Sequence, residues 1–194
     1  LAVMRAIPGM RVFDPADAVE TRAILEYLAQ TPGPAYMRVP RGKVPVLLDA
    51  TTYRFQAGTA AVLRTGQDVT LVACGISVAW ALEAADELAR RGISARVLNM
   101  ASIKPLDEAA ILEAARQTGC MVTAENHSIL GGLGSAVAEV TAQACPVPVL
   151  RVGIRDVFGE VGPTGWLADK FGLSAPHIVE AAQEAVKLKE KRSK

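Results

Sequence analysis

The chain has 194 residues, of which 51% are hydrophobic and 21% are charged, and its formal net charge is +1. This composition is typical of a globular protein and excludes a disordered one. The near-zero net charge excludes the strongly basic surface of nucleic-acid and membrane-surface binders, so we expect neither partner. No apolar run approaches the roughly 18 residues that a membrane-spanning helix requires.

The length suits one complete domain and part of another. The chain opens on Leu1 with what looks like the end of a helix that has no visible start, so we expect a piece of a longer protein. Three cysteines (Cys74, Cys120 and Cys145) lie in or beside apolar runs and have no metal-ligand spacing. This pattern is typical of reduced thiols in a core, which favours a cytoplasmic protein.

The first 45 residues have the pattern of a strand, a helix and a second strand. Met10–Phe13 is apolar, and a helix start follows, with Asp14 as the N-cap and Pro15 at the first helical position. The predicted helix runs to about Gln30, and the second strand covers Ala35–Val39. Because such a unit crosses over with one hand, its two strands are expected to lie parallel in one sheet.

Charged residues follow both of these strands. Asp17 comes shortly after the first strand and Arg38 lies near the end of the second, with Arg41 and Lys43 close behind. Because ligands bind at the carboxyl ends of parallel strands, we expect Asp17 and Arg38 to face the same ligand-binding edge. The residues alone leave alternatives open, since Asp17 can simply complement the helix N-terminus and Arg38 can form an ordinary ion pair.

Residues 46–57 show no clear periodicity and indicate a linker to a second domain, residues 58–194. That domain begins with two apolar segments, Gly58–Arg64 and Asp68–Cys74, which the turn residues between them predict to be a hairpin. Further strands are predicted at 95–100, 120–124 and 147–154, and helices at 78–91, 108–118, 165–171 and 175–191. The alternation predicts an α/β fold, namely a three-layer α/β/α domain with a mostly parallel sheet and one antiparallel edge strand.

A glycine-rich turn lies in the stretch Val122–Ala138, which reads VTAENHSILGGLGSAVA and continues into a predicted helix. Glycine turns before helices can bind phosphate, but this spacing matches neither the dinucleotide-binding nor the P-loop pattern. A structural role for the glycines is therefore favoured. His127 has no second His or Cys at ligand spacing, which is typical of a hydrogen-bonded corner residue rather than a catalyst or metal ligand.

The sequence AENHSILGGLGSAVAE (residues 124–139) resembles the signature of the transketolase C-terminal domain, especially in transketolases divided into two subunits. Deoxyxylulose-phosphate synthase and the 2-oxoacid dehydrogenase β-subunits share the glycine turn but lack the Asn-His pair. MRAIPGMRVFDPADAVE (residues 4–20) resembles the second half of the transketolase pyrimidine-binding domain. The resemblance thus implies a truncated α/β domain of the thiamine-binding type (residues 1–45), the linker and a complete C-terminal domain.

The resemblance also implies roles for two residues. Asp17 is the aspartate of the P-A-D motif, which hydrogen-bonds a hydroxyl of the sugar substrate, and Arg38 in YMRVPRG takes the position that binds the sugar phosphate. A carboxylate rejects substrates that lack the hydroxyl, and a guanidinium makes bidentate contacts with phosphate. No catalytic, cofactor-binding or metal-binding residue is assigned, and His127 and His177 match none of the family's active-site histidines.

The implied reaction transfers a two-carbon ketol unit between sugar phosphates, as in the pentose phosphate pathway, with thiamine diphosphate and Mg²⁺ in the complete enzyme. The metal motif and the cofactor-activating glutamate of the family are not in this chain. We therefore expect the fragment alone to be inactive, to bind no cofactor and to serve subunit packing. The expected partners are an N-terminal transketolase portion or subunit and a second copy in a homodimer.

Two alternatives remain open at the level of the sequence. The chain could be a non-catalytic α/β interaction module, in which an exposed sheet edge and the glycine turn mediate dimerisation. It could also be the equivalent part of deoxyxylulose-phosphate synthase or of a 2-oxoacid dehydrogenase β-subunit.

Overall fold

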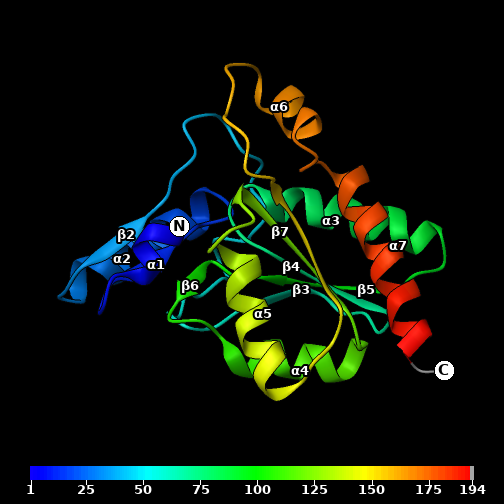
Figure 1. The fold of residues 1–194 in the computed structure, drawn as a ribbon. Coiled ribbons are helices and arrows are strands. Elements are labelled where there is room, and N and C mark those ends of the chain that lie inside the picture. The colour runs from blue at the N-terminus through cyan, green and yellow to red at the C-terminus, as the bar shows by residue number, and fades with distance from the viewer. Residues whose placement is uncertain (193–194) are drawn as a thin grey trace.

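The structure is a computed structural model that describes residues 1–192, and within them a five-stranded main sheet carries helices on both faces (Figure 1). Its strands lie in the order β3-β5-β4-β7-β8. Their bounds are β3 Ala61–Arg64, β4 Val69–Ala73, β5 Ala95–Asn99, β7 Met121–Ser128 and β8 Val149–Ile154. Neighbouring strands are parallel except β3, which runs antiparallel to β5 at the edge. The predicted mostly parallel sheet with one antiparallel edge strand is confirmed.

In the described part of the chain, two helices cover each face of the main sheet (Figure 1). They are α3 (Ser77–Arg90) and α7 (Ala175–Arg192) on one face, and α4 (Glu108–Thr118) and α5 (Leu133–Ala144) on the other. The side chains of β4 alternate between the two cores, with Leu71 packed on the α3–α7 side and Val72 on the α4–α5 side. Burial of one such side chain contributes about 1.5–3 kcal/mol. The apolar run of β4 therefore requires cover on both faces, which is the predicted three-layer α/β/α domain.

Residues 1–45 join a second, three-stranded sheet. Its order is β2 (Ala35–Met37), β1 (Arg11–Phe13) and β6 (Ser102–Lys104). β1 and β2 are parallel, as predicted, whereas β6 runs antiparallel to β1. β6 lies between β5 and α4 in the sequence, where three residues give no periodicity that predicts a strand. This short strand links the first 45 residues to the rest of the chain through its backbone (Figure 1).

The helix of the first 45 residues begins later than the sequence predicts. After α1 (Ala2–Ala6) and β1, the chain stays irregular until α2 (Ala18–Gln30), and the N-cap is Asp17 rather than Asp14. Asp17 has an extended backbone and accepts a hydrogen bond from the backbone N–H of Glu20. The spacing of Asp17 and Glu20 is that of a capping box. The prediction of Asp14 as the N-cap was wrong because its backbone and side chain have partners outside the helix, described below.

The predicted hairpin of β3 and β4 is also wrong. β3 pairs with β5 and so lies at the edge beyond it, not beside β4. The connection passes the start of β5 at Gly66, where an added Cβ would lie 2.2 Å from the backbone carbonyl carbon of Ala95. Only glycine permits so close an approach of two backbones. The turn residues that predicted a hairpin therefore allow a crossing over the neighbouring strand.

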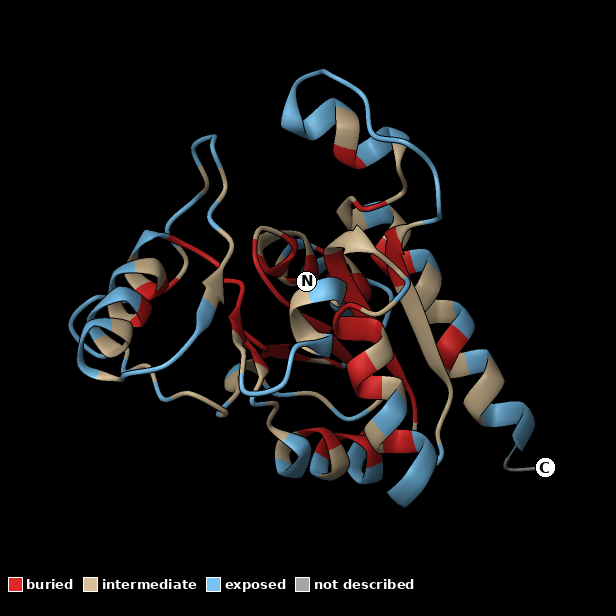
Figure 2. Cartoon of the chain, turned by 60° about the vertical axis from the view of Figure 1, so that its left-hand side comes forward, coloured by how far each residue is buried: buried red, intermediate tan, exposed pale blue. Residues whose placement is uncertain are grey.

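The segment 155–163 and α6 (Thr164–Lys170) project from the body of the domain, and most of their surface faces solvent (Figure 2). Phe158 is 99% exposed, and Val161 and Trp166 are exposed as well. Residues 155–163 form no helix or strand. No helix within residues 1–192 combines the length and the apolar character needed to cross a membrane.

Candidate functional site at the junction of the two sheets

The carboxyl ends of the two sheets face each other, and charged residues gather where they meet. Asp14 directly follows β1 and Arg38 directly follows β2, so both lie at one edge of the small sheet. The backbone N–H of Asp14 donates to the carbonyl of Ala101 after β5 (2.8 Å), and the N–H of Gly75 after β4 donates to the carbonyl of Asp14 (2.9 Å). Arg38 Nη1 donates to the carbonyl of Asn126 at the end of β7 (2.6 Å). Hydrogen bonds to three strand ends of the main sheet thus fix the junction.

Arg38 forms a bidentate ion pair with Asp14. Its Nε lies 3.1 Å from Oδ1 and its Nη2 lies 2.5 Å from Oδ2 of Asp14. The Asp14 side chain is 3% exposed and that of Arg38 is 25% exposed, so the pair is anchored inside the protein and open on the arginine side. A guanidinium has five N–H donors, and three have acceptors among the described residues. Arg38 thus forms the ion pair that the sequence left open as an alternative. Its other two N–H groups have no acceptor among the described residues and can bind an oxyanion of a ligand.

Asp17 is buried, and the chain itself occupies its carboxylate. Oδ1 accepts the N–H of Glu20 (2.9 Å), and Oδ2 accepts the N–H groups of Leu47 (2.7 Å) and Leu48 (2.8 Å). The side chain therefore caps α2 and fixes the linker against the helix. This arrangement is the alternative that the sequence left open, an acidic residue at a helix start. Arg41 and Lys43, which we expected close by, are exposed on the loop that follows β2.

The N-terminus of α5 binds a carboxylate of the chain itself. Glu125 Oε2 accepts the N–H of Leu133 (2.7 Å) and Oε1 accepts the N–H of Gly134 (2.8 Å). Burial raises the pKa of Glu125, and these two backbone donors oppose that rise. An added Cβ at Gly132 would lie 1.9 Å from Oε2, so the glycine makes room for the glutamate. The predicted structural role of the glycines is confirmed, and the donors that could have bound a phosphate already hold Glu125.

His127 is hydrogen-bonded, as predicted, but it lies within β7 rather than at a corner. Its Nδ1 lies 2.8 Å from the carbonyl oxygen of Ser128 and 3.7 Å from Oε2 of Glu125. Both neighbours are acceptors, so the proton is assigned to Nδ1. Burial lowers the pKa of His127, which favours the neutral imidazole at neutral pH. Within residues 1–192, no group of three or more His, Cys, Asp or Glu is arranged to hold a metal ion.

Glu20 is buried and bonds to several segments of the chain, and the sequence analysis missed it. Its carboxylate accepts the N–H of Ala16 (2.7 Å), the Nδ2 of Asn99 (2.9 Å) and the hydroxyl of Tyr53. It therefore ties α2 to the linker and to the end of β5. Burial raises the pKa of Glu20, and burial together with the Glu20 charge raises that of Tyr53. The capping-box spacing of Asp17 and Glu20 is the one signal in the sequence that could have identified this residue.

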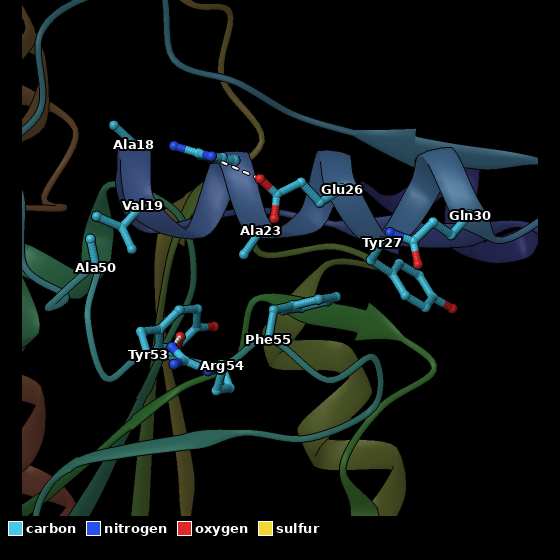
Figure 3. Close-up of a pocket in the computed structure, with 11 residues that line it drawn as sticks. Ala18, Val19, Ala23, Glu26, Tyr27, Gln30, Ala50, Tyr53, Arg54 and Phe55 are labelled. Atoms are coloured by element: carbon cyan, nitrogen blue, oxygen red, sulfur yellow. Dashed lines mark hydrogen bonds and ion pairs between the residues drawn. The ribbon is translucent and has the colours of Figure 1, made fainter.

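A groove of about 750 Å³ runs between α2 and residues 50–55 (Figure 3). Val19 and Ala23 on the helix face Tyr53 and Phe55 across it. Three of its polar side chains already have partners, since Arg22 and Glu26 pair with each other and the Tyr53 hydroxyl bonds to Glu20. A binding site for a small polar molecule needs polar groups that converge on it. The groove has the character of a packing surface, and the candidate site is the junction around Arg38.

Comparison with known proteins finds two families along the chain. The family described as transketolase, pyrimidine binding domain, matches residues 1–46, and that described as transketolase, C-terminal domain, matches residues 58–178. A split-gene transketolase described as an inactive β4 tetramer superimposes with a TM-score of 0.93 and 51% identity, over 97% of this chain and 61% of that one.

Two relatives illustrate the range of functions among similar proteins. The 6-deoxy-6-sulfo-D-fructose transketolase subunit of Clostridium sp. (strain MSTE9) is 50% identical over 189 residues, which are 97% of this chain and 58% of that protein. The 1-deoxy-D-xylulose-5-phosphate synthase 1 of Geobacter sulfurreducens is 42% identical over 186 residues, 94% of this chain and 29% of that enzyme. The chain therefore spans little more than half the length of the former relative and less than a third of the latter.

Proposed function

The chain belongs to the transketolase family, and we propose that it is the C-terminal portion of a split transketolase that transfers a two-carbon ketol unit between sugar phosphates. Support comes from the order of the two domain matches and from a 50% identical relative that is named as a transketolase subunit. The division into residues 1–45, a linker at 46–57 and residues 58–194 belongs to this proposal. So do a cytoplasmic location and a place in the pentose phosphate pathway.

Arg38 is the residue through which this chain contacts the substrate in our proposal. The observation that carries it is the anchored guanidinium, which is 25% exposed and keeps N–H donors free beside its pair with Asp14. Planar N–H donors match the oxygens of a phosphate. One relative is named for a sugar phosphate and another for a sulfonated sugar, and both of these sugars carry a tetrahedral oxyanion. We commit to phosphate, and a preference for the sulfonate is an outcome that the assay below can reveal.

Asp17 contributes in our proposal through the acceptor capacity that its structural bonds leave. A carboxylate has about four lone-pair sites, and three backbone N–H groups use part of them. The residue is 1% exposed, so a sugar hydroxyl would bond to the remaining site on Oδ1 only once the complete enzyme makes this side chain accessible. Capping of α2 is the role that the hydrogen bonds support, and the contact with the hydroxyl is the part that mutagenesis has to test.

The family implies thiamine diphosphate in the complete enzyme, and we add Mg²⁺ as its metal. The residues of this chain do not fit that group: the helix N-terminus best placed to bind a diphosphate already holds Glu125, and residues 1–192 contain no metal-ligand cluster. We therefore propose that the N-terminal portion holds the cofactor. In an isothermal titration, the chain alone should bind thiamine diphosphate with a Kd above about 1 mM, and micromolar binding would contradict this assignment.

The partner in our proposal is the N-terminal transketolase portion. Mixing it with the complete C-terminal subunit, thiamine diphosphate and Mg²⁺ should produce ketol transfer that neither protein shows alone. Continued inactivity of the mixture would favour a non-catalytic interaction module. We also propose self-association as a homodimer, although the 51% identical neighbour is described as a β4 tetramer, and light scattering on the chain decides between the two.

A second candidate function is the synthesis of 1-deoxy-D-xylulose 5-phosphate, favoured by the 42% identity to an enzyme of that name. The same reconstituted mixture can be analysed for this product by mass spectrometry. Its formation in place of ketol transfer would replace the transketolase assignment.

A further inference from the structure

We propose that Asp14 is a positioning residue for Arg38. In this proposal the C-terminal part of the chain supplies the further contacts that orient Arg38 toward the substrate phosphate. The inference rests on the proposed role of Arg38. It adds a residue with no assigned role, and it gives the C-terminal domain a part in substrate binding.

The pair with Asp14 sets the direction of a flexible side chain. An arginine side chain has about 2 kcal/mol of rotamer entropy, which a free side chain loses when it binds a ligand. Here Nε and Nη2 are already bonded to the two carboxylate oxygens of Asp14, at 3.1 and 2.5 Å. The guanidinium is thus ordered before the ligand arrives, and this preorganisation strengthens binding.

The main sheet supplies the third bond. Arg38 Nη1 donates to the backbone carbonyl of Asn126 at 2.6 Å. All three guanidinium nitrogens therefore have an acceptor, which fixes the plane of the group. The N–H groups that remain are on the two terminal nitrogens of a side chain that is 25% exposed. An oxyanion can bind there without breaking the pair with Asp14.

Asp14 is itself held by the C-terminal part of the chain. Its backbone bonds to the carbonyl of Ala101 and to the N–H of Gly75, at 2.8 and 2.9 Å. Gly75 has a φ of +57° and an added Cβ there would lie 2.6 Å from Oδ2 of Asp14. The turn after β4 therefore packs directly against the carboxylate that orients Arg38. A change in this turn would reach the arginine through Asp14.

A steady-state comparison separates positioning from a structural role. The complete C-terminal subunit is combined with its N-terminal portion, and kcat and KM are measured for a ketose phosphate, its sulfonate analogue and the free ketose. Asp14→Asn should raise KM for the phosphate about 10-fold or more, with kcat within about twofold and KM for the free ketose unchanged. The control Asp86→Asn removes an exposed pair with Arg64 and should change neither constant.

The outcomes distinguish this inference from the proposed function. Equal effects of Asp14→Asn on the phosphorylated and free ketose would indicate a structural role alone and overturn the inference. A selective defect in Arg38→Ala that Asp14→Asn does not reproduce would leave the proposed role of Arg38 standing and overturn the positioning by Asp14. Unchanged phosphate binding in both variants would overturn both.

A second measurement does not depend on activity. In ¹⁵N-labelled subunit, hydrogen exchange at Nε of Arg38 should be slower than at the exposed Arg54, because Nε donates to Asp14. Asp14→Asn should bring the exchange rate of Arg38 close to that of Arg54. Fast exchange in the unaltered subunit would show that the pair does not fix the guanidinium and would overturn the inference whatever the reaction proves to be.

Discussion

Replacing Glu125 with alanine tests how the N-terminus of α5 is held. Glu125 accepts the N–H groups of Leu133 and Gly134 at 2.7 and 2.8 Å, and the substitution leaves both donors buried without an acceptor. Each such donor costs about 1–3 kcal/mol. Part of this loss is recovered, because burial disfavours the charged carboxylate and raises its pKa. We expect the free energy of unfolding to fall by about 2–3 kcal/mol.

Urea unfolding of the chain, followed by far-UV circular dichroism, measures this loss. Glu113→Ala is the matched control, because Glu113 is an exposed glutamate on α4, and its effect should stay within about 0.5 kcal/mol. A loss below about 0.5 kcal/mol for Glu125→Ala would refute the reasoning, since it would mean that water or other groups satisfy the two donors.

Gly132→Ala sharpens the same test. Its Cβ would lie 1.9 Å from Oε2 of Glu125, whereas its φ of −84° suits any residue. The alanine should therefore destabilise the unaltered chain and cost much less when Glu125 is already alanine. A coupling free energy of about 1 kcal/mol or more in this double-mutant cycle would locate the clash at the glutamate. Additive effects would place the cost elsewhere.

Three further predictions concern stability and substrate binding. Burial raises the pKa of Glu20 above 4.5, so the folded chain binds the proton of its carboxyl group more tightly than the unfolded chain does. Glu20 therefore lowers the free energy of unfolding as the pH rises from 4.5 to the raised pKa. Urea titrations at successive pH values should show that Glu20→Gln makes the slope of the unfolding free energy against pH less negative in that window, by up to about 1.4 kcal/mol per pH unit; unchanged slopes would contradict this. Asp17→Ser keeps a capping oxygen and should cost about 1 kcal/mol less stability than Asp17→Ala. If the carboxylate also contacts the sugar, both Asp17 variants lose ketol transfer equally, whereas activity in Asp17→Ser would restrict this residue to capping. Gly66→Ala should cost about 1–3 kcal/mol in chemical unfolding because its Cβ meets the backbone of Ala95, and Gly159→Ala, with open space around it, is the control; equal costs would refute the crossing over β5.

The helices and strands of the C-terminal part follow from local patterns that the sequence shows directly. α4 has the predicted bounds, 108–118, because its N-cap side chain (Asp107) and its left-handed C-cap (Gly119) are local features. The glycines before α5 were also interpreted correctly as structural. The capping of α2 was not, because Asp14 and Asp17 are equally good N-caps by residue type, and contacts from elsewhere in the chain decide between them.

The candidate site likewise combines features that the sequence predicted with features that it did not. The strand pattern predicted that Arg38 lies at a carboxyl edge, and the ligand-binding tendency of such edges made it a candidate. Nothing local predicted its partners, which are Asp14, 24 positions away, and Asn126, 88 positions away. Glu20 was missed for the same reason, since its partner Asn99 lies 79 positions further along the chain.

The sequence by itself determined the α/β class, the mostly parallel sheet and the position of the glycine turn, because these depend on residue type and on periods of a few residues. Only the tertiary structure decided that β3 pairs with β5, that β6 joins the small sheet, and that the N-terminus of α5 holds Glu125. The physical reason is that a backbone N–H donor or a charged side chain can pair with any suitable group. Packing of the whole chain, through burial of its two cores, determines which partner lies within hydrogen-bonding distance.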